Sequence, residues 1–149
     1  MDGVFPTPGS AGIPGHFRHL HNAVFGLTGD EALPLPVKFL LEYDTRDPFA
    51  VTFSFGSQPK KWTFARELLT TGLERRSSEG GVQLGPLPEV NNVTIVELDT
   101  PEGRTAFESP TWQLQDFLCC SYAIVPRGQE HLCLEIDAAL SGFQREGDA

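Results

Sequence analysis

Apolar and polar residues alternate in two short stretches of the first half of the chain, and these stretches predict its clearest strands. Every second side chain of 37–43 and 51–55 is apolar: Val37, Phe39, Leu41, Tyr43, Val51, Phe53 and Phe55. A period of two is typical of a half-buried strand. Residues 44–48 (DTRDP) favour a turn, because Asp side chains accept bonds from nearby backbone N–H groups and Pro48 fixes φ. A hairpin is therefore expected.

A helix is expected next, over about 64–71, with Thr63 as its N-cap residue. The predicted inward-facing residues are Phe64, Ala65, Leu68 and Leu69. The predicted outward-facing residues are Arg66, Glu67 and Thr70. Gly72 would take the left-handed position that ends a helix. Residues 60–62 (KKW) would form a brief strand that pairs back on 51–55.

Weaker patterns predict the elements on either side of this unit. A first strand is expected over about 17–27, with Phe17, Ala23 and Phe25 on one face and Leu20 and Val24 on the other. Residues 77–81 (SSEGG) are typical of a flexible loop. A strand over 82–87 is assigned to a sheet edge, because it is interrupted by proline, which cannot donate to a strand ladder.

The second half is expected to repeat this plan. Residues 93–98 predict a strand buried on both faces, and a hairpin turn at 99–103 leads to a return strand over 104–108. Ser109 would cap a second helix with Pro110 at its first position. The predicted inner stripe of that helix is Leu114, Phe117, Leu118 and Ser121. A last short helix is expected over about 136–143.

This order of strands, helix, strands, helix and short helix predicts an α+β fold with antiparallel sheets. A length of 149 residues suits one domain, placed at 16–143. Residues 1–15 are rich in glycine and proline and are expected to be a disordered leader, while 144–149 should be a frayed tail. No apolar run reaches the ~20 residues of a membrane span. The absence of a secretory signal and the odd count of three cysteines favour a cytoplasmic protein without disulfides.

Charge argues against nucleic acid as a partner and singles out one basic cluster. The net charge is −9, which opposes phosphate backbones. The candidate partner-binding residues are Lys60, Lys61, Trp62, Arg66, Arg75 and Arg76. They could grip a single-stranded nucleic acid by charge and stacking, or hold an acidic protein segment. A solvated rim around the first helix explains the same residues equally well.

Candidate catalytic and metal-binding residues are few. His19 and His21 would share a strand face with His16 on the other, and an exposed face is favoured over a metal site. Asp44, Asp47 and nearby Glu42 suit turn chemistry better than acid–base catalysis. Cys119, Cys120 and His131 are not placed together by any motif, and no nucleophile motif is present. No enzyme activity, catalytic residue, metal or cofactor is therefore predicted.

Longer motifs carry a family resemblance over about 17–143. Residues 43–51 (YDTRDPFAV) and 62–69 (WTFARELL) are its most specific parts, and Ser109-Pro110, Val125-Pro126 and 135–137 (EID) agree with it. With these motifs the chain resembles the SsgA-like proteins, the sporulation-specific cell-division regulators of filamentous actinobacteria. Departures are the glycine- and proline-rich leader and the Cys119-Cys120 pair.

The resemblance implies a fold and a function. The fold would be whirly-like, with two antiparallel sheets packed with helices, and the protein would form a homo-oligomer, a trimer. The function would be non-catalytic: marking septum sites in the cytoplasm, and recruiting the tubulin-like protein FtsZ and stimulating its polymerisation. An SsgB-type role is the first choice, with an SsgA-type family member as a further partner. The alternative is a single-stranded nucleic-acid-binding protein of whirly-like fold.

Overall fold

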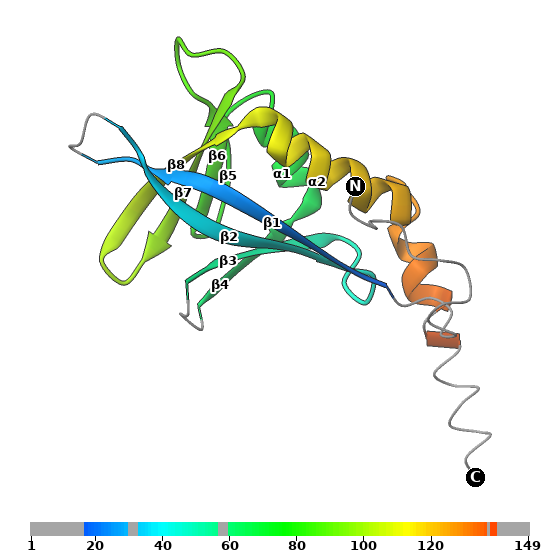
Figure 1. Ribbon diagram of the computed structural model, residues 1–149. Coiled ribbons are helices and arrows are strands. Elements are labelled where there is room, and N and C mark those ends of the chain that lie inside the picture. The colour runs from blue at the N-terminus through cyan, green and yellow to red at the C-terminus, as the bar shows by residue number, and fades with distance from the viewer. Residues whose placement is uncertain (1–16, 30–32, 57–59, 137, 140–149) are drawn as a thin grey trace.

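The described part of the backbone forms one eight-stranded antiparallel sheet, the helices α1 and α2, and a helical segment after α2 (Figure 1). The computed structural model describes residues 17–29, 33–56, 60–136 and 138–139. Its elements are β1 Arg18–Leu27, β2 Leu35–Asp44, β3 Ala50–Phe55, β4 Lys61–Ala65, α1 Arg66–Gly72, β5 Ser77–Glu79, β6 Val82–Pro86, β7 Val93–Thr100, β8 Gly103–Pro110 and α2 Thr111–Ile124. The predicted α+β class is confirmed, whereas the leader, the tail and the domain boundaries drawn from them lie outside the described residues.

The sheet is continuous, in the order β4-β3-β2-β1-β8-β7-β6-β5. Two sheets were expected, but β1 and β8 join the halves through the pairs Gly26–Glu108 and Leu27–Phe107. At this junction Gly26 is crowded from the side of β2, since a Cβ there would lie 2.6 Å from the Cβ of Pro34. The expectation of two sheets is therefore wrong, and the whirly-like description stays a prediction.

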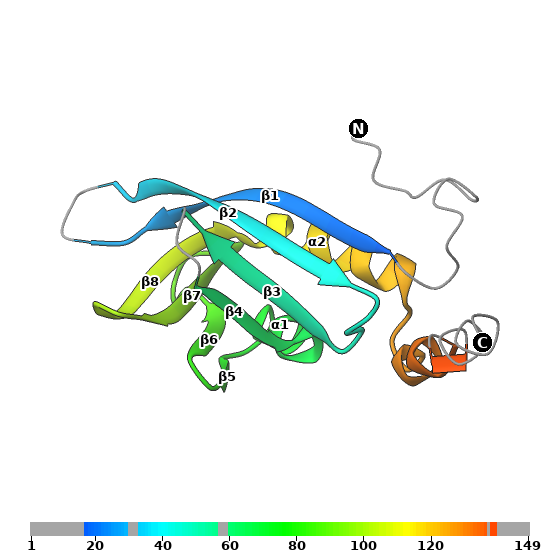
Figure 2. The same ribbon diagram turned by 90° about the horizontal axis from the view of Figure 1, so that it is seen from below.

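The sheet curls so that its halves face one another around a core (Figures 1 and 2). Phe107 on β8 packs against Phe39 on β2, with 5.0 Å between ring centroids. The Trp62 indole N–H on β4 donates to the Asp99 carbonyl oxygen on β7 over 3.0 Å. The Trp62 bond joins β4 to β7, which are far apart in the strand order, so the curled sheet encloses its own apolar face.

Most strand predictions for the first half are confirmed. β2 and β3 pair as the predicted hairpin, and β4 pairs back on β3. On β1 the residues Ala23 and Phe25 are buried while Leu20 and Val24 are exposed, as the alternation indicates. The predicted hairpin turn between β7 and β8 is also present.

The start of α1 is predicted wrongly. Residues 63–65 continue β4, where Thr63 is exposed and its hydroxyl bonds with that of Thr52 over 2.9 Å. The helix therefore begins at Arg66 with Ala65 as N-cap. Gly72 belongs to the helix instead of the left-handed position, and a Cβ there would lie 2.8 Å from the Cβ of Leu84. Gly72 thus permits close packing of α1 on β6.

Four predictions for the second half are also corrected. Part of the expected loop at 77–81 is strand β5, which pairs with β6, so β6 is not an edge strand. Ser109 is the penultimate residue of β8, and Pro110 is the N-cap residue of α2. A further helical segment begins at residue 130, earlier than the predicted 136. The inner stripe of α2 is confirmed, since all four predicted residues are buried.

Candidate interaction surfaces

The fold divides the predicted basic cluster between interior and surface. Arg66 and Trp62 are 1% and 6% exposed, so these two side chains lie inside the protein. Lys60 and Lys61 are exposed at the start of β4, and Arg75 is exposed after α1. Arg76 forms an ion pair with Glu97 over 3.2 Å. The assignment of a partner to these residues stays a prediction, but Arg66 has no exposed face to offer, and Trp62 faces only the cavity described below.

Arg66 lies at the end of the curled sheet where α1, α2 and the segment after α2 meet. Its guanidinium lies between two tyrosine rings, 4.8 Å from the centroid of Tyr43 and 4.0 Å from that of Tyr122. It donates to the Ser121 carbonyl oxygen over 3.0 Å and to the Glu130 carboxylate over 2.8 Å. The predicted outward orientation of Arg66 is therefore wrong. The charge is compensated by an ion pair and ring faces, which is how a buried arginine is stabilised.

The titration of two neighbours reflects this burial. Burial by itself raises the pKa of Glu130, but hydrogen bonds from Arg66 and from backbone N–H groups outweigh it, so its pKa lies below the ordinary value. Burial raises the pKa of Tyr43 above its ordinary value, although the Arg66 charge opposes this. At neutral pH the arginine thus faces a carboxylate and a neutral phenol. This region, Arg66 with Tyr43, Ser121, Tyr122 and Glu130, is called the arginine end below.

A cavity of about 240 Å³ opens elsewhere, between the inner faces of the two half-sheets. Its lining comes from β1–β4 and from the β7–β8 hairpin: Leu27, Val37, Phe55, Lys60, Trp62, Thr100, Pro101, Glu102, Thr105 and Phe107. The Trp62 ring stacks on Phe55, with centroids 5.5 Å apart and planes 5° from parallel. The Lys60 amine lies 5.8 Å from the centroid of the Trp62 ring. This cavity is called the mouth below.

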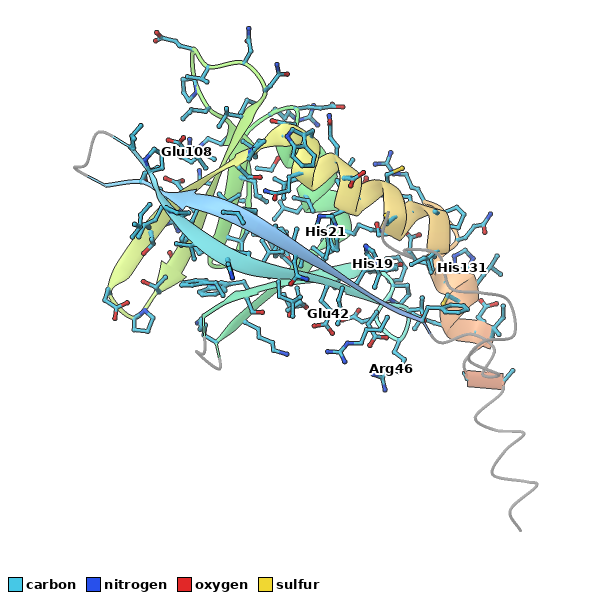
Figure 3. All side chains as sticks on the ribbon, viewed as in Figure 1. His19, His21, Glu42, Arg46, Glu108 and His131 are labelled. Carbon is cyan, nitrogen blue, oxygen red and sulfur yellow. The ribbon has the colours of Figure 1, made fainter. Side chains whose placement is uncertain are left out.

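The histidines of β1 pack against α2 and do not form an exposed face (Figure 3). His19 is 9% exposed and stacks on Phe117 with 5.9 Å between ring centroids. Among the described residues, no atom is a hydrogen-bond partner of its Nε2. Burial, assisted by the nearby His21, lowers the pKa of His19. The expected exposed face is thus wrong for His19, and His16 lies outside the described residues.

The acidic turn behaves as predicted. The Asp44 carboxylate accepts from the backbone N–H of Arg46 over 2.9 Å, and the backbone N–H of Asp47 donates to the Asp44 carbonyl oxygen over 2.9 Å. Glu42 instead pairs with Arg18 on β1 over 2.8 Å. These contacts confirm the predicted turn chemistry for the Asp44 side chain, while Asp47 takes part in the turn through its backbone.

The remaining candidates for chemistry stay apart. Cys119, Cys120 and Cys133 are not joined by disulfides, and the Cys133 thiol donates to the Thr45 carbonyl oxygen over 3.4 Å. His131 is exposed on the helical segment after α2 (Figure 3). Within residues 17–29, 33–56, 60–136 and 138–139, no three His, Cys, Asp or Glu side chains gather as metal ligands would. Nor is any helix in those ranges long and apolar enough to cross a bilayer.

Comparison with known proteins decides the family. Residues 37–130 match the family described as "Streptomyces sporulation and cell division protein, SsgA". The chain is 38% identical over 129 residues to "Sporulation-specific cell division protein SsgB" of Saccharopolyspora erythraea, covering 85% of this chain and 92% of the relative. The chain belongs to the SsgA family. The SsgB protein of Streptomyces coelicolor is also 38% identical, over 80% of this chain and 89% of that relative.

Solved structures of SsgA-family proteins share the fold. The crystal structure of an SsgA-like sporulation-specific cell division protein from Thermobifida fusca has a TM-score of 0.74 and 30% identity, covering 88% of this chain and 98% of that one. A structure of SsgB from work on longitudinal cell division during sporulation of Streptomyces coelicolor has a TM-score of 0.70 and 34% identity, covering 79% and 96%. These identities confirm the resemblance seen in the sequence motifs.

Sequence reasoning missed the arginine end and the mouth. The buried residues of α1 are Arg66, Leu69 and Gly72, which follow one another at intervals of three. That spacing places the three residues on one helix face, so it would have predicted the burial of Arg66 if the start of α1 at Arg66 had been known. The mouth has no local signal, because one wall comes from residues 27–62 and the other from residues 100–107.

Proposed function

We propose that this SsgA-family protein is a cell-division protein of the SsgB type, acting in sporulation by binding other proteins and not by catalysis. The observation that carries the proposal is the 38% identity to an SsgB protein over 92% of that relative. Similarity of fold to solved SsgB and SsgA-like proteins supports it. The names of these relatives concern cell division and no chemical reaction.

The proposed action is to mark septum sites and to recruit FtsZ and stimulate its polymerisation. Exposed cationic side chains at Lys60, Lys61 and Arg75 supply charge for an acidic protein segment, although the chain as a whole is acidic. The test mixes the purified protein with FtsZ, once with GTP and once with GDP, and sediments the polymers. The protein is expected in the pellet only with GTP, and electron microscopy should show longer polymers.

The control for this test is an unrelated acidic protein of similar size, which should stay in the supernatant. Retention of the SsgA-family protein in the supernatant from low to physiological salt would contradict direct recruitment of FtsZ. Co-purification with an SsgA-type family member would then be the remaining route to the septum. A fluorescent fusion in a sporulating culture should lie in the cytoplasm at the division septa, whichever route holds.

We propose a homotrimer as the working form. Exposed apolar side chains on the outer face of β1, Leu20 and Val24, support self-association. Analytical ultracentrifugation should give the mass of three chains, and replacing both residues by Glu should give the mass of one. A wild-type mass of one chain across micromolar concentrations contradicts the trimer.

Single-stranded nucleic acid remains the weaker candidate. Stacking would need an exposed aromatic ring beside the basic residues, yet Trp62 is buried and its N–H is bonded to Asp99. Titration of the protein with a fluorescent oligonucleotide at low salt should show no saturable binding.

A further inference from the structure

The mouth is a concave apolar site that the packing of the core leaves open. Phe55, Trp62 and Phe107 supply aromatic surface, and the ring centroids of Phe55 and Phe107 lie 5.4 Å apart. Trp62 is fixed by its stacking on Phe55 and by its hydrogen bond to Asp99. The walls are therefore held in place before anything binds, which lowers the entropic cost of binding.

Two side chains of opposite charge stand among the lining residues. Lys60 comes from the segment before β4 and Glu102 from the β7–β8 turn, so the two charges belong to different walls. Glu102 accepts a long contact of 3.5 Å from the Thr100 hydroxyl. Within the part of the chain that the structure describes, neither charge forms an ion pair. Both are therefore available to a ligand that brings its own charges.

The size of the mouth limits what it can take. At about 240 Å³ it is smaller than the cavities of roughly 300–1,000 Å³ that hold drug-sized molecules. It has room for one large side chain, with the rest of the ligand outside. Mouths of curled sheets are common binding positions, and a buried aromatic anchor surrounded by polar contacts is typical of protein–protein recognition.

We propose that the mouth binds a protein partner through one large apolar side chain, flanked on the partner by an acidic residue that meets Lys60 and a basic residue that meets Glu102. The partner is thus an extended segment in which an apolar residue stands between an acidic and a basic residue, in either order along its chain. The proposed site in the mouth rests on the proposed function only in that each assigns the protein a role in binding other proteins. The experiment below contains no FtsZ, so the mouth and the recruitment of FtsZ can fail independently.

The neighbouring lysine provides a matched control. Side chains alternate across β4, where Trp62 is buried and Lys61 is exposed. Lys60 lines the mouth, whereas Lys61 does not. K60E and K61E therefore make the same change of charge one residue apart, and only the first alters the proposed site.

The test uses the full-length protein and the peptide acetyl-Asp-Phe-Lys-amide, followed by ¹H–¹⁵N correlation spectra. The chain has two tryptophans, so the Trp62 indole N–H reports on the mouth while exposed Trp112 serves as an internal reference. The Trp62 signal should shift saturably with a Kd on the order of 1 mM. Acetyl-Asp-Ala-Lys-amide should bind at least about tenfold more weakly, because it lacks the anchor. Acetyl-Gln-Phe-Gln-amide should bind about two- to fivefold more weakly.

Charge variants complete the test. K60E and E102K should each lower the affinity for acetyl-Asp-Phe-Lys-amide about fivefold. The double variant K60E/E102K should restore the affinity, since the peptide can then bind in the opposite direction. K61E should bind this peptide as the wild type does, because Lys61 does not line the mouth. The role proposed for Lys61 above concerns FtsZ, which is absent from this experiment. The proposal is overturned if the Trp62 signal does not shift at peptide concentrations up to about 10 mM, tenfold above the expected Kd. It is also overturned if K61E weakens peptide binding as much as K60E does. A Trp62 signal that moves with protein concentration alone would also overturn it, because a second copy would then occupy the mouth.

Discussion

The arginine end and the mouth draw on one basic cluster of the sequence and use its residues in opposite ways. At the arginine end, Arg66 is enclosed by two tyrosine rings and paired with Glu130. At the mouth, Lys60 is exposed over the Trp62 ring. The difference teaches that neighbouring positive charges in a sequence do not define a surface. Enclosure and a counter-charge give Arg66 a structural role, while the open rim leaves the Lys60 amine accessible for the binding role proposed above.

The largest expected effect separates the two kinds of arginine. Arg66→Ala should lower the free energy of unfolding by about 3–5 kcal/mol, because it leaves the Glu130 carboxylate largely buried without its partner. Arg76→Ala removes an ion pair whose arginine is 62% exposed, so it should cost no more than about 1 kcal/mol. Urea unfolding of both variants checks this. Equal losses of unfolding free energy in the two variants would contradict the distinction between a structural arginine and a surface arginine.

The next effect concerns the core beneath the arginine end. Leu69 is fully buried on the face of α1 that also carries Arg66, whereas Leu68 is partly buried. Leu69→Ala should cost about 2–5 kcal/mol by opening a cavity. Leu68→Ala should cost less, although the sequence pattern placed both residues in one stripe. A larger loss for Leu68→Ala in the same unfolding assay would mean that α1 is rotated from its position here.

At the mouth the expected effect is smaller. Trp62→Phe keeps an aromatic ring but removes the N–H that donates to Asp99, and it should cost about 0.5–1.5 kcal/mol. Trp112 is 62% exposed, so Trp112→Phe should change stability by less than about 0.5 kcal/mol. Thermal unfolding of the two variants gives the comparison. A neutral Trp62→Phe would show that this bond does not help to join the half-sheets.

The smallest expected effect is a pH dependence from His19. Burial lowers the pKa of His19 in the folded protein, so the unfolded chain takes up its proton first as the pH falls below about 6.5. The unfolded state then binds more protons, and the free energy of unfolding should decrease from pH 7 to pH 5. Glu130, whose pKa is lowered from 4.5, loses its contribution only at more acidic pH.

The variant His19→Leu should flatten the slope between pH 7 and pH 5, as measured by urea midpoints. His131→Gln serves as the control, because His131 is exposed and should leave the slope in place. An unchanged slope in His19→Leu would show that another group causes the pH dependence.

Local chemistry was enough to predict most of the strands. The hairpin of β2 and β3 follows from alternation and from the Asp-rich turn, and the structure places both as expected. The stripe of α2 follows from helical spacing. Membership of the SsgA family follows from motifs in β2–α1 and is confirmed by the comparisons.

What could not be predicted depends on contacts between distant segments. Thr63 was assigned as a cap because hydroxyl residues cap helices, but its bond to Thr52 shows that strand pairing decided its conformation. Arg66 was expected outside because isolated charges avoid burial, yet Glu130, 64 residues away, supplies the counter-charge. The mouth arises only when Trp62 meets Asp99 across the curled sheet.

The central claim is that the fold turns Trp62 and Arg66 of the basic cluster inward and leaves Lys60 at an open rim. Acrylamide quenching of tryptophan fluorescence in the Trp112→Phe variant tests it most directly, because Trp62 is then the sole emitter. At 6% exposure, Trp62 should emit at shorter wavelength than free tryptophan and be quenched far less in the folded than in the urea-unfolded protein. Equal quenching in the two states would contradict the claim, since Trp62 would then be an exposed ring beside the lysines.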